Sequence, residues 1–279
     1  RVTDYLRPRT IDEALDARAA YPDWMVLAGG TDLMVNANLR ADPPGILDLW
    51  RLPGLGGITA HAGGLAIGAG TTWLEVERDR EVLARYAPLA AAAREIGALQ
   101  IQARATLGGN VGTSSPVGDS LPVLLALDAE LELASVRGRR RVPYRAFCVG
   151  YRKTLLAADE LIVAAHLPAP APHTALAWRK VGTRRAQSIS KVMGAAAIEL
   201  DGGVVRAARI ALGAVADRPI RVAAVEDAVR GLSPARAAEA ARAALRTAIA
   251  PIDDVRSTAA YRRGVAENLV ARFFSGILS

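Results

Sequence analysis

The stretch that decides the expected fold is Val26-Leu27-Ala28-Gly29-Gly30-Thr31-Asp32-Leu33. Its apolar start belongs to a short strand predicted over residues 24–28. The paired glycines that follow carry no side chain, so their backbone amides can approach an anion closely. Thr31 adds a hydroxyl that can hydrogen-bond an oxygen, and Thr31-Asp32 can cap a helix predicted from Leu33 to Leu39. The stretch therefore predicts an anion-binding loop between a strand and a helix.

A second loop has the same design and is Thr106-Leu107-Gly108-Gly109-Asn110. It also combines two glycines with a hydroxyl. Neither loop contains a lysine or the G-x-G-x-x-G spacing, which excludes a Walker loop and a Rossmann fingerprint. Two amide-rich loops in one domain suit a diphosphate, because its two anionic groups are adjacent.

The first part of the chain alternates between helix and strand signals. Thr10 and Glu13 form a capping box, in which the two side chains are expected to satisfy each other's backbone amides at the start of a helix. From Ile58 onward the pattern changes to a hairpin and short helices. The predicted elements are a strand at 46–49, a hairpin at 58–60 and 65–67, a helix after the capping box Thr72–Glu75, a helix at 89–96 and a helix at 121–127.

Alternating prolines at 168–172 mark a domain boundary, because they favour a stiff extended spacer. Beyond it, antiparallel strands are predicted at 174–181, 194–200 and 204–211, and helices at 221–229, 234–248 and 257–274. The prediction is an α+β chain with a first domain at 1–167 (parts at about 1–55 and 56–167), a linker at 168–173 and a small sheet-plus-helices domain at 174–279. Phe273-Phe274 and Ile277-Leu278 either cover a partner or pack on the domain's own sheet.

The composition excludes several classes of protein. The formal charge is +7, but few aromatic residues accompany the basic run at 137–141, so nucleic-acid binding is not expected and the run is predicted to be a solvated hairpin turn. A single cysteine, Cys148, cannot hold an iron–sulfur cluster, and the histidines lack metal-ligand spacing. No apolar run is long enough to span a membrane and no signal segment is evident, so a cytoplasmic protein without its own metal site is expected.

These motifs together resemble those of a known family. Residues 26–33 resemble the first FAD-binding loop of the molybdenum hydroxylase flavoproteins, and residues 106–110, followed by Asp119, resemble the second. Residues 151–156 resemble a segment of xanthine dehydrogenases, and Tyr261-Arg262-Arg263 resembles a motif before the last helix of that family. The resemblance covers nearly the whole chain. It implies a two-part FAD-binding domain of the vanillyl-alcohol oxidase type, followed by a small carboxy-terminal domain.

The resemblance also implies where FAD binds. Residues 26–33 and 106–110 would cradle the pyrophosphate, Asp119 would fix the adenosine side, Ile162 would supply an apolar contact and Lys180 would lie near the isoalloxazine. Because no histidine falls in either loop, covalent attachment of the flavin is not expected. The chain's lysines all fall between 153 and 191, which independently supports a special role for Lys180, whose ammonium would stabilise reduced flavin. No side chain is expected to act as a catalytic acid or base.

The function implied is electron transfer inside a heteromeric complex. A molybdopterin-binding large subunit would oxidise the substrate, [2Fe-2S] clusters of a small subunit would carry the electrons, and FAD would pass them to an acceptor such as NAD or a quinone. A dimer of heterotrimers is expected. Xanthine or another purine is the first expected substrate, while aldehydes, N-heterocycles and carbon monoxide stay open. Two alternatives also stay open: a stand-alone FAD-dependent reductase, and a flavin-free nucleotide-binding scaffold subunit.

Overall fold

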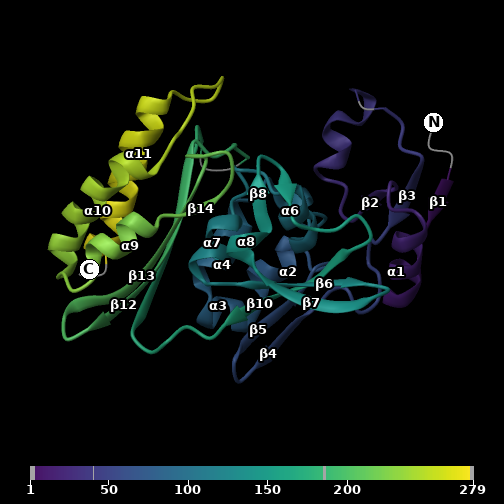
Figure 1. Ribbon diagram of the computed structural model, residues 1–279, viewed down its shortest axis with the longest axis horizontal. Coiled ribbons are helices and arrows are strands. Elements are labelled where there is room, and N and C mark those ends of the chain that lie inside the picture. The colour runs from purple at the N-terminus through teal and green to yellow at the C-terminus, as the bar shows by residue number, and fades with distance from the viewer. Residues whose placement is uncertain (1–3, 40, 185–186, 277–279) are drawn as a thin grey trace.

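The computed structural model describes residues 4–39, 41–184 and 187–276. Three parts follow one another along the long axis of the molecule, in the order in which they occur in the chain (Figure 1). A small parallel sheet comes first and a five-stranded antiparallel sheet with helices comes second. A four-stranded antiparallel sheet covered by helices comes third. This is the α+β organisation expected from the sequence.

The first part is built on a three-stranded parallel sheet with strand order β1-β3-β2. The helix α1 begins after Thr10, whose hydroxyl accepts a hydrogen bond from the Glu13 amide at 3.1 Å. The Glu13 carboxylate, however, accepts from the Arg9 amide at 2.7 Å and not from Thr10, so the expected capping box is displaced by one residue. The elements are β1 (Asp4–Leu6), α1 (Ile11–Ala20), β2 (Met25–Leu27), the 3-10 helix η1 (Leu33–Leu39) and β3 (Gly45–Asp48).

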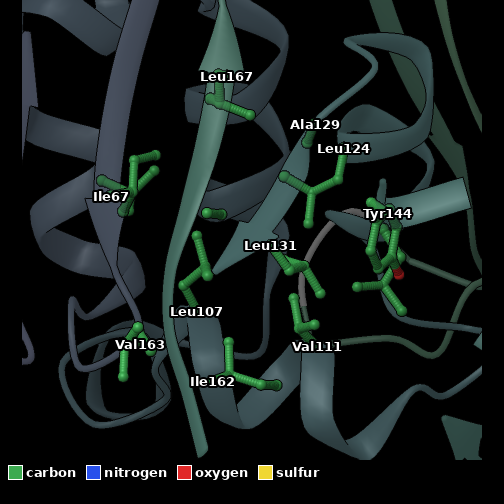
Figure 2. Close-up of a cluster of buried hydrophobic side chains, with 14 of the residues drawn as sticks. Ile67, Leu107, Val111, Leu124, Ala129, Leu131, Tyr144, Ile162, Val163 and Leu167 are labelled. Carbon is green, nitrogen blue, oxygen red and sulfur yellow. The ribbon is translucent and has the colours of Figure 1, made fainter. Parts of the chain in front are cut away.

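The second part is a five-stranded antiparallel sheet with strand order β4-β5-β10-β6-β7. The helix α6 packs against β5 and β10. The buried cluster in Figure 2 includes Leu107 and Val111 of α6 together with Ile162 of β10. This packing fixes the second glycine loop against the sheet. The elements are β4 (Ile58–His61), β5 (Gly64–Gly68), α2 (Trp73–Arg78), α3 (Arg80–Arg85), α4 (Ala87–Glu95), α5 (Leu99–Gln102), α6 (Leu107–Thr113), α7 (Leu121–Ala126), β6 (Glu130–Ser135), β7 (Gly138–Pro143), α8 (Tyr144–Phe147), β8 (Cys148–Gly150), β9 (Lys153–Thr154) and β10 (Leu161–Pro168).

The basic run at 137–141 lies in a solvent-exposed β-hairpin, as expected from the sequence, but only Arg137 belongs to the turn at residues 136–137. The arginines that follow belong to the edge strand β7. Arg139 pairs with Glu132 at 2.7 Å, and Arg140 pairs with Glu160 at 2.6 Å. The arginines of the run neutralise carboxylates on neighbouring segments. Charged side chains also discourage pairing with another strand at an open sheet edge.

The third part is a four-stranded antiparallel sheet with order β11-β12-β13-β14, and both of its faces are packed. Helices α9 to α11 cover one face, while α4 and α7 of the second part contact the sheet. Successive residues of β12 show this arrangement, since Ala195 belongs to the core of the second part and Ala196 to the core under α9 to α11. The elements are β11 (Thr174–Val181), β12 (Val192–Asp201), β13 (Val204–Gly213), β14 (Ile220–Arg221), α9 (Ala223–Val229), α10 (Pro234–Ala248) and α11 (Ala259–Ser275).

Two details near and within this part bear on expectations from the sequence. Phe273 and Phe274 are buried in the core beneath the sheet, so they pack on the domain's own strands. Ile277-Leu278 lie outside the described residues. Pro168 is the last residue of β10 and pairs with Gly64, so the first proline of the expected spacer belongs to a strand.

Candidate functional site

A cleft of about 700 Å³ is lined by residues of both the first and the second part. It brings together the two glycine loops, which are far apart in sequence. The sequence-predicted residues that line it are Val26, Ala28, Gly29, Gly30, Thr31, Asp32, Leu33, Thr106, Gly108, Gly109, Asn110 and Ile162. Leu27, Asp119 and Lys180 are not among its lining residues.

The first glycine loop offers free backbone donors. Within the described residues, the amides of residues 29–32 donate no hydrogen bond to the protein. Gly29 is pressed against the segment just before the second loop, because a Cβ there would lie 1.8 Å from the carbonyl oxygen of Arg104. Gly30 has a φ of +78°, a conformation that favours glycine. The loop therefore presents unpaired amides beside a cleft, which is the donor set that a phosphate or diphosphate needs.

The second glycine loop differs from this expectation. All four amides of residues 107–110 already donate within the chain. Those of Leu107 and Gly108 donate to the carbonyls of Thr71 and Ala69, at 2.9 and 2.8 Å. The Gly109 amide donates to the Thr106 hydroxyl at 3.1 Å, and the Asn110 amide donates to the Thr106 carbonyl at 3.0 Å. The loop consequently provides a wall of the cleft and no free amides.

Gly109 is the exposed point of this wall. A Cβ at Gly109 would meet only the Thr106 hydroxyl, at 3.0 Å, whereas one at Gly108 would lie 2.7 Å from the Cβ of Ala69. Gly108 is therefore needed for packing, and Gly109 leaves space on the cleft side. The side chain of Asn110 is fixed by a hydrogen bond, since its Oδ1 accepts from the Ser120 hydroxyl at 2.7 Å. A flat ring can approach such a wall closely.

Asp119 and Lys180 form a buried ion pair. The Nζ of Lys180 lies 2.6 Å from one carboxylate oxygen of Asp119, and the Ser190 hydroxyl donates to the other at 2.5 Å. Burial raises the pKa of Asp119, and the Lys180 ammonium opposes that rise. The sequence resemblance assigned Asp119 to the adenosine side of FAD and Lys180 to the isoalloxazine, whereas the structure brings the two side chains into direct contact. The backbone of Asp119 also accepts from the Trp178 indole at 3.0 Å, which makes this pair a junction between the domains.

Two acidic groups line the cleft, and each has a partner. Asp32 lies 3.4 Å from the guanidinium of Arg152. Glu160 accepts two hydrogen bonds from Arg140, at 2.6 and 2.7 Å, and these hold the pKa of Glu160 below its usual value. The acidic groups of the cleft are thus neutralised in place and do not repel an anionic ligand.

Several lining residues were not singled out from the sequence. Trp24, Val26 and Ala28 all line the cleft while Leu27 does not, as the alternation of side chains along a strand requires. The alternation of side chains along the strand could therefore have indicated from the sequence that Trp24, and not Leu27, lines the site. Arg18 on α1 also lines the cleft, and no local motif pointed to it.

The described residues contain no group of three or more His, Cys, Asp or Glu side chains that could hold a metal ion. Cys148 is half-buried and accepts a hydrogen bond from the Ser114 hydroxyl at 2.9 Å. None of the helices in the described residues has the length and apolar character needed to cross a membrane.

Comparisons with known proteins cover both domains. Residues 1–170 match the family described as the FAD binding domain in molybdopterin dehydrogenase, and residues 177–277 match the CO dehydrogenase flavoprotein C-terminal domain. The xanthine dehydrogenase FAD-binding subunit of Escherichia coli O157:H7 is 38% identical over 221 residues, which are 78% of this chain and 75% of that protein. The nicotine 6-hydroxylase medium subunit of Paenarthrobacter nicotinovorans is 32% identical over 96% of this chain and 94% of its own.

The fold agrees with solved structures of similar proteins. A chain of the carbon monoxide dehydrogenase from Hydrogenophaga pseudoflava superposes with a TM-score of 0.93 at 32% identity, covering 98% of this chain and 96% of that one. A chain of quinoline 2-oxidoreductase from Pseudomonas putida 86 gives a TM-score of 0.89 at 26% identity, covering 99% and 96%. The expected fold is confirmed, and the chain belongs to the family of molybdopterin dehydrogenase flavoproteins that is defined by this FAD binding domain.

Proposed function

We propose that this chain is the FAD-binding, electron-transferring subunit of a molybdenum hydroxylase of the xanthine dehydrogenase type. The observation that carries the proposal is the row of unpaired amides at residues 29–32 beside the cleft. Bound FAD would supply the redox chemistry, because a flavin exchanges one or two electrons. The protein's residues bind and orient it, and none needs to act as an acid or base.

The donor set of the cleft fits FAD. The amides of residues 29–32 and the Thr31 hydroxyl would hold the pyrophosphate. Gly109 would let a ring approach the opposite wall, and Ile162 would contact that ring with an apolar side chain. Asp119 directly follows Gly118, which lines the cleft, so we place the isoalloxazine at the wall that the Asp119–Lys180 pair supports. The Lys180 ammonium would then act on the flavin electrostatically, from the far side of this wall.

The names of the relatives support a set of partner subunits. Two proteins similar to this chain are named a medium subunit and a medium chain, and the solved carbon monoxide dehydrogenase is described as lacking the Mo-pyranopterin moiety of its molybdenum cofactor. We therefore propose a large molybdopterin subunit and a small [2Fe-2S] subunit as partners, assembled as a dimer of heterotrimers. We place the complex in the cytoplasm, with NAD or a quinone as the terminal acceptor.

The test is the flavin content of the purified chain. The visible spectrum should show oxidised flavin, and acid precipitation should release about one FAD per chain into the supernatant. Flavin retained in the pellet, or FMN in place of FAD, would contradict the proposal. A flavin-free protein would favour the scaffold alternative. A flavoprotein that oxidises a reducing substrate without molybdenum or iron would favour the stand-alone reductase.

A further inference from the structure

The cleft contains one half-buried cation that the proposed function has not used. Two arginines line the cleft, Arg18 and Arg152. Arg152 lies beside Asp32, at 3.4 Å. Among the described residues, no carboxylate forms a salt bridge with Arg18, although the charge of Asp23 acts on it from farther away. Arg18 is thus the cleft-lining cation without a salt bridge to the described residues.

The position of Arg18 is fixed by a single hydrogen bond. Its Nη1 donates to the carbonyl oxygen of Trp24 at 3.0 Å, which ties α1 to the start of β2. Its Nε is buried and has no acceptor in the structure. A buried donor without a partner costs free energy, so the guanidinium is only partly satisfied by the protein. Burial also lowers the pKa of Arg18, so a ligand with acceptor oxygens would relieve an unfavourable environment.

Trp24 gives this side of the cleft a rigid surface. Its ring stacks on Tyr21 with centroids 4.2 Å apart and an interplanar angle of 18°. It also covers Gly45 so closely that a Cβ there would lie 2.3 Å from the indole. Trp24 thus packs directly on the backbone of β3, and Arg18 and Trp24 together form one corner of the cleft in the first part.

The two walls of the cleft differ in chemistry. The wall from the second part includes Ile96, Ile101 and Ile162, which suit a large apolar ring. The wall from the first part adds a guanidinium to Trp24 and Val26. The phosphate next to the adenosine of FAD is anionic, whereas the oxidised isoalloxazine has hydrogen-bond acceptors but no charge. A charged, planar guanidinium with several donors therefore gains more from the phosphate side of the ligand.

We propose that Arg18 binds the adenosine-phosphate half of FAD and is the residue through which the cleft selects FAD over FMN. This inference rests on the proposed FAD function. Arg18 compensates for the absence of a lysine in both glycine loops, because it brings a positive charge to the cleft from a helix outside them. FMN has no adenosine, so its binding gains nothing from this contact.

A purely structural role for Arg18 is the competing explanation. In that case its hydrogen bond to Trp24 merely joins α1 to β2, and its loss lowers stability for every ligand alike. The two explanations separate when affinities for FAD, FMN and ADP are compared in the same variant. ADP is the informative probe because it contains the adenosine and phosphates of FAD without the flavin.

The experiment uses the full chain, freed of flavin, as wild type, Arg18→Gln, Arg18→Lys and the control Arg9→Gln. Arg9 is an exposed arginine just before the same helix. Fluorescence titration gives the dissociation constants for FAD and FMN, and thermal unfolding gives the protection by ADP. We expect Arg18→Gln to weaken FAD about tenfold or more, as for a lost charge-assisted hydrogen bond, with FMN within twofold of wild type. ADP should protect the wild type and Arg9→Gln but not Arg18→Gln.

Each other outcome decides against the inference. Unchanged FAD affinity in Arg18→Gln, or equal weakening of FAD and FMN, overturns it, as does a wild type that ADP does not protect. If Arg18→Gln does not fold, Arg18→Lys is judged by the same criteria, since it keeps the charge and loses the planar fork. A wild type that binds no FAD would instead contradict the proposed function itself, so the two failures remain distinguishable.

Discussion

The Nζ of Lys180 lies 2.6 Å from the carboxylate of Asp119. This ion pair joins strand β11 of the third part to the residue that follows the cleft-lining Gly118 in the second part. Lys180 also donates to the backbone carbonyl of Glu95 at 3.2 Å. Both side chains are almost wholly buried. The pair therefore holds the carboxy-terminal domain against the domain that contains both glycine loops.

Replacing Lys180 with methionine should destabilise the chain by about 3–5 kcal/mol at pH 7, because it leaves a buried carboxylate without its cation. Burial already raises the pKa of Asp119, and the loss of Lys180 should raise it further. A carboxyl with a raised folded pKa destabilises the fold when it ionises, so the deficit should shrink as the pH falls through that pKa. Urea unfolding at several pH values measures this, with Asp119→Asn/Lys180→Met expected to recover part of the loss. A deficit that does not depend on pH would contradict the assignment.

Gly109→Val should yield a folded chain that purifies with little flavin. The Cβ and its branches would enter the cleft, because only the Thr106 hydroxyl limits them. The cause would be lost space and not a lost amide, since that amide already bonds to Thr106. The matched control is Gly264→Val, at an exposed helical position where a Cβ meets nothing within 4 Å. Equal flavin content in the two variants would show that residue 109 does not face the ligand.

Glu160→Gln should reduce stability at neutral pH by about 1–3 kcal/mol through the loss of charge-assisted hydrogen bonds to Arg140. The depressed pKa of Glu160 means that its contribution is complete above the ordinary value of 4.5 and is lost as the pH falls through the folded value. The wild type should therefore lose stability below about pH 4.5 more steeply than the variant. Asp227→Asn, which breaks an exposed pair with Arg230, should change stability by less than about 0.5 kcal/mol.

A tag placed on this chain alone should recover two further chain types when neighbouring reading frames are expressed with it. The recovered complex should contain molybdenum and iron, which the described residues of this chain give no site to bind. Activity is to be assayed with xanthine first, then with aldehydes, N-heterocycles and carbon monoxide. Recovery of this chain alone, under conditions in which the partners are expressed and soluble, would count against the complex.

Local elements were predictable because their causes lie close together in sequence. The capping box of Thr72 and Glu75 forms as expected, with the Thr72 amide 2.7 Å from the Glu75 carboxylate. The strand at 174–181 and the helix at 234–248 were predicted with the bounds that the structure has. Such elements depend on capping, alternation and glycine or proline positions, all of which can be read within a short window.

Features set by distant contacts were not predictable in this way. The partner of Asp119 is 61 residues away in sequence, and no local pattern relates the two. The amides of the second glycine loop were expected to be free, but Leu107 and Gly108 donate to the strand-following residues Thr71 and Ala69. Arg18 lines the cleft although its helix, α1, packs against β3 and β6. Each of these outcomes depends on how the sheets meet, which one sequence does not reveal.

The unpaired amides at residues 29–32 also determine how this loop should behave in hydrogen–deuterium exchange. Without a ligand, none of these four protons is bonded to an acceptor in the described part of the protein, whereas those of residues 107–110 are all bonded to the chain. The two glycine loops should therefore exchange at very different rates in the flavin-free chain, despite their similar sequences. Flavin binding should slow exchange mainly in the first loop, which makes its amides a direct reporter of how fully the subunit is loaded.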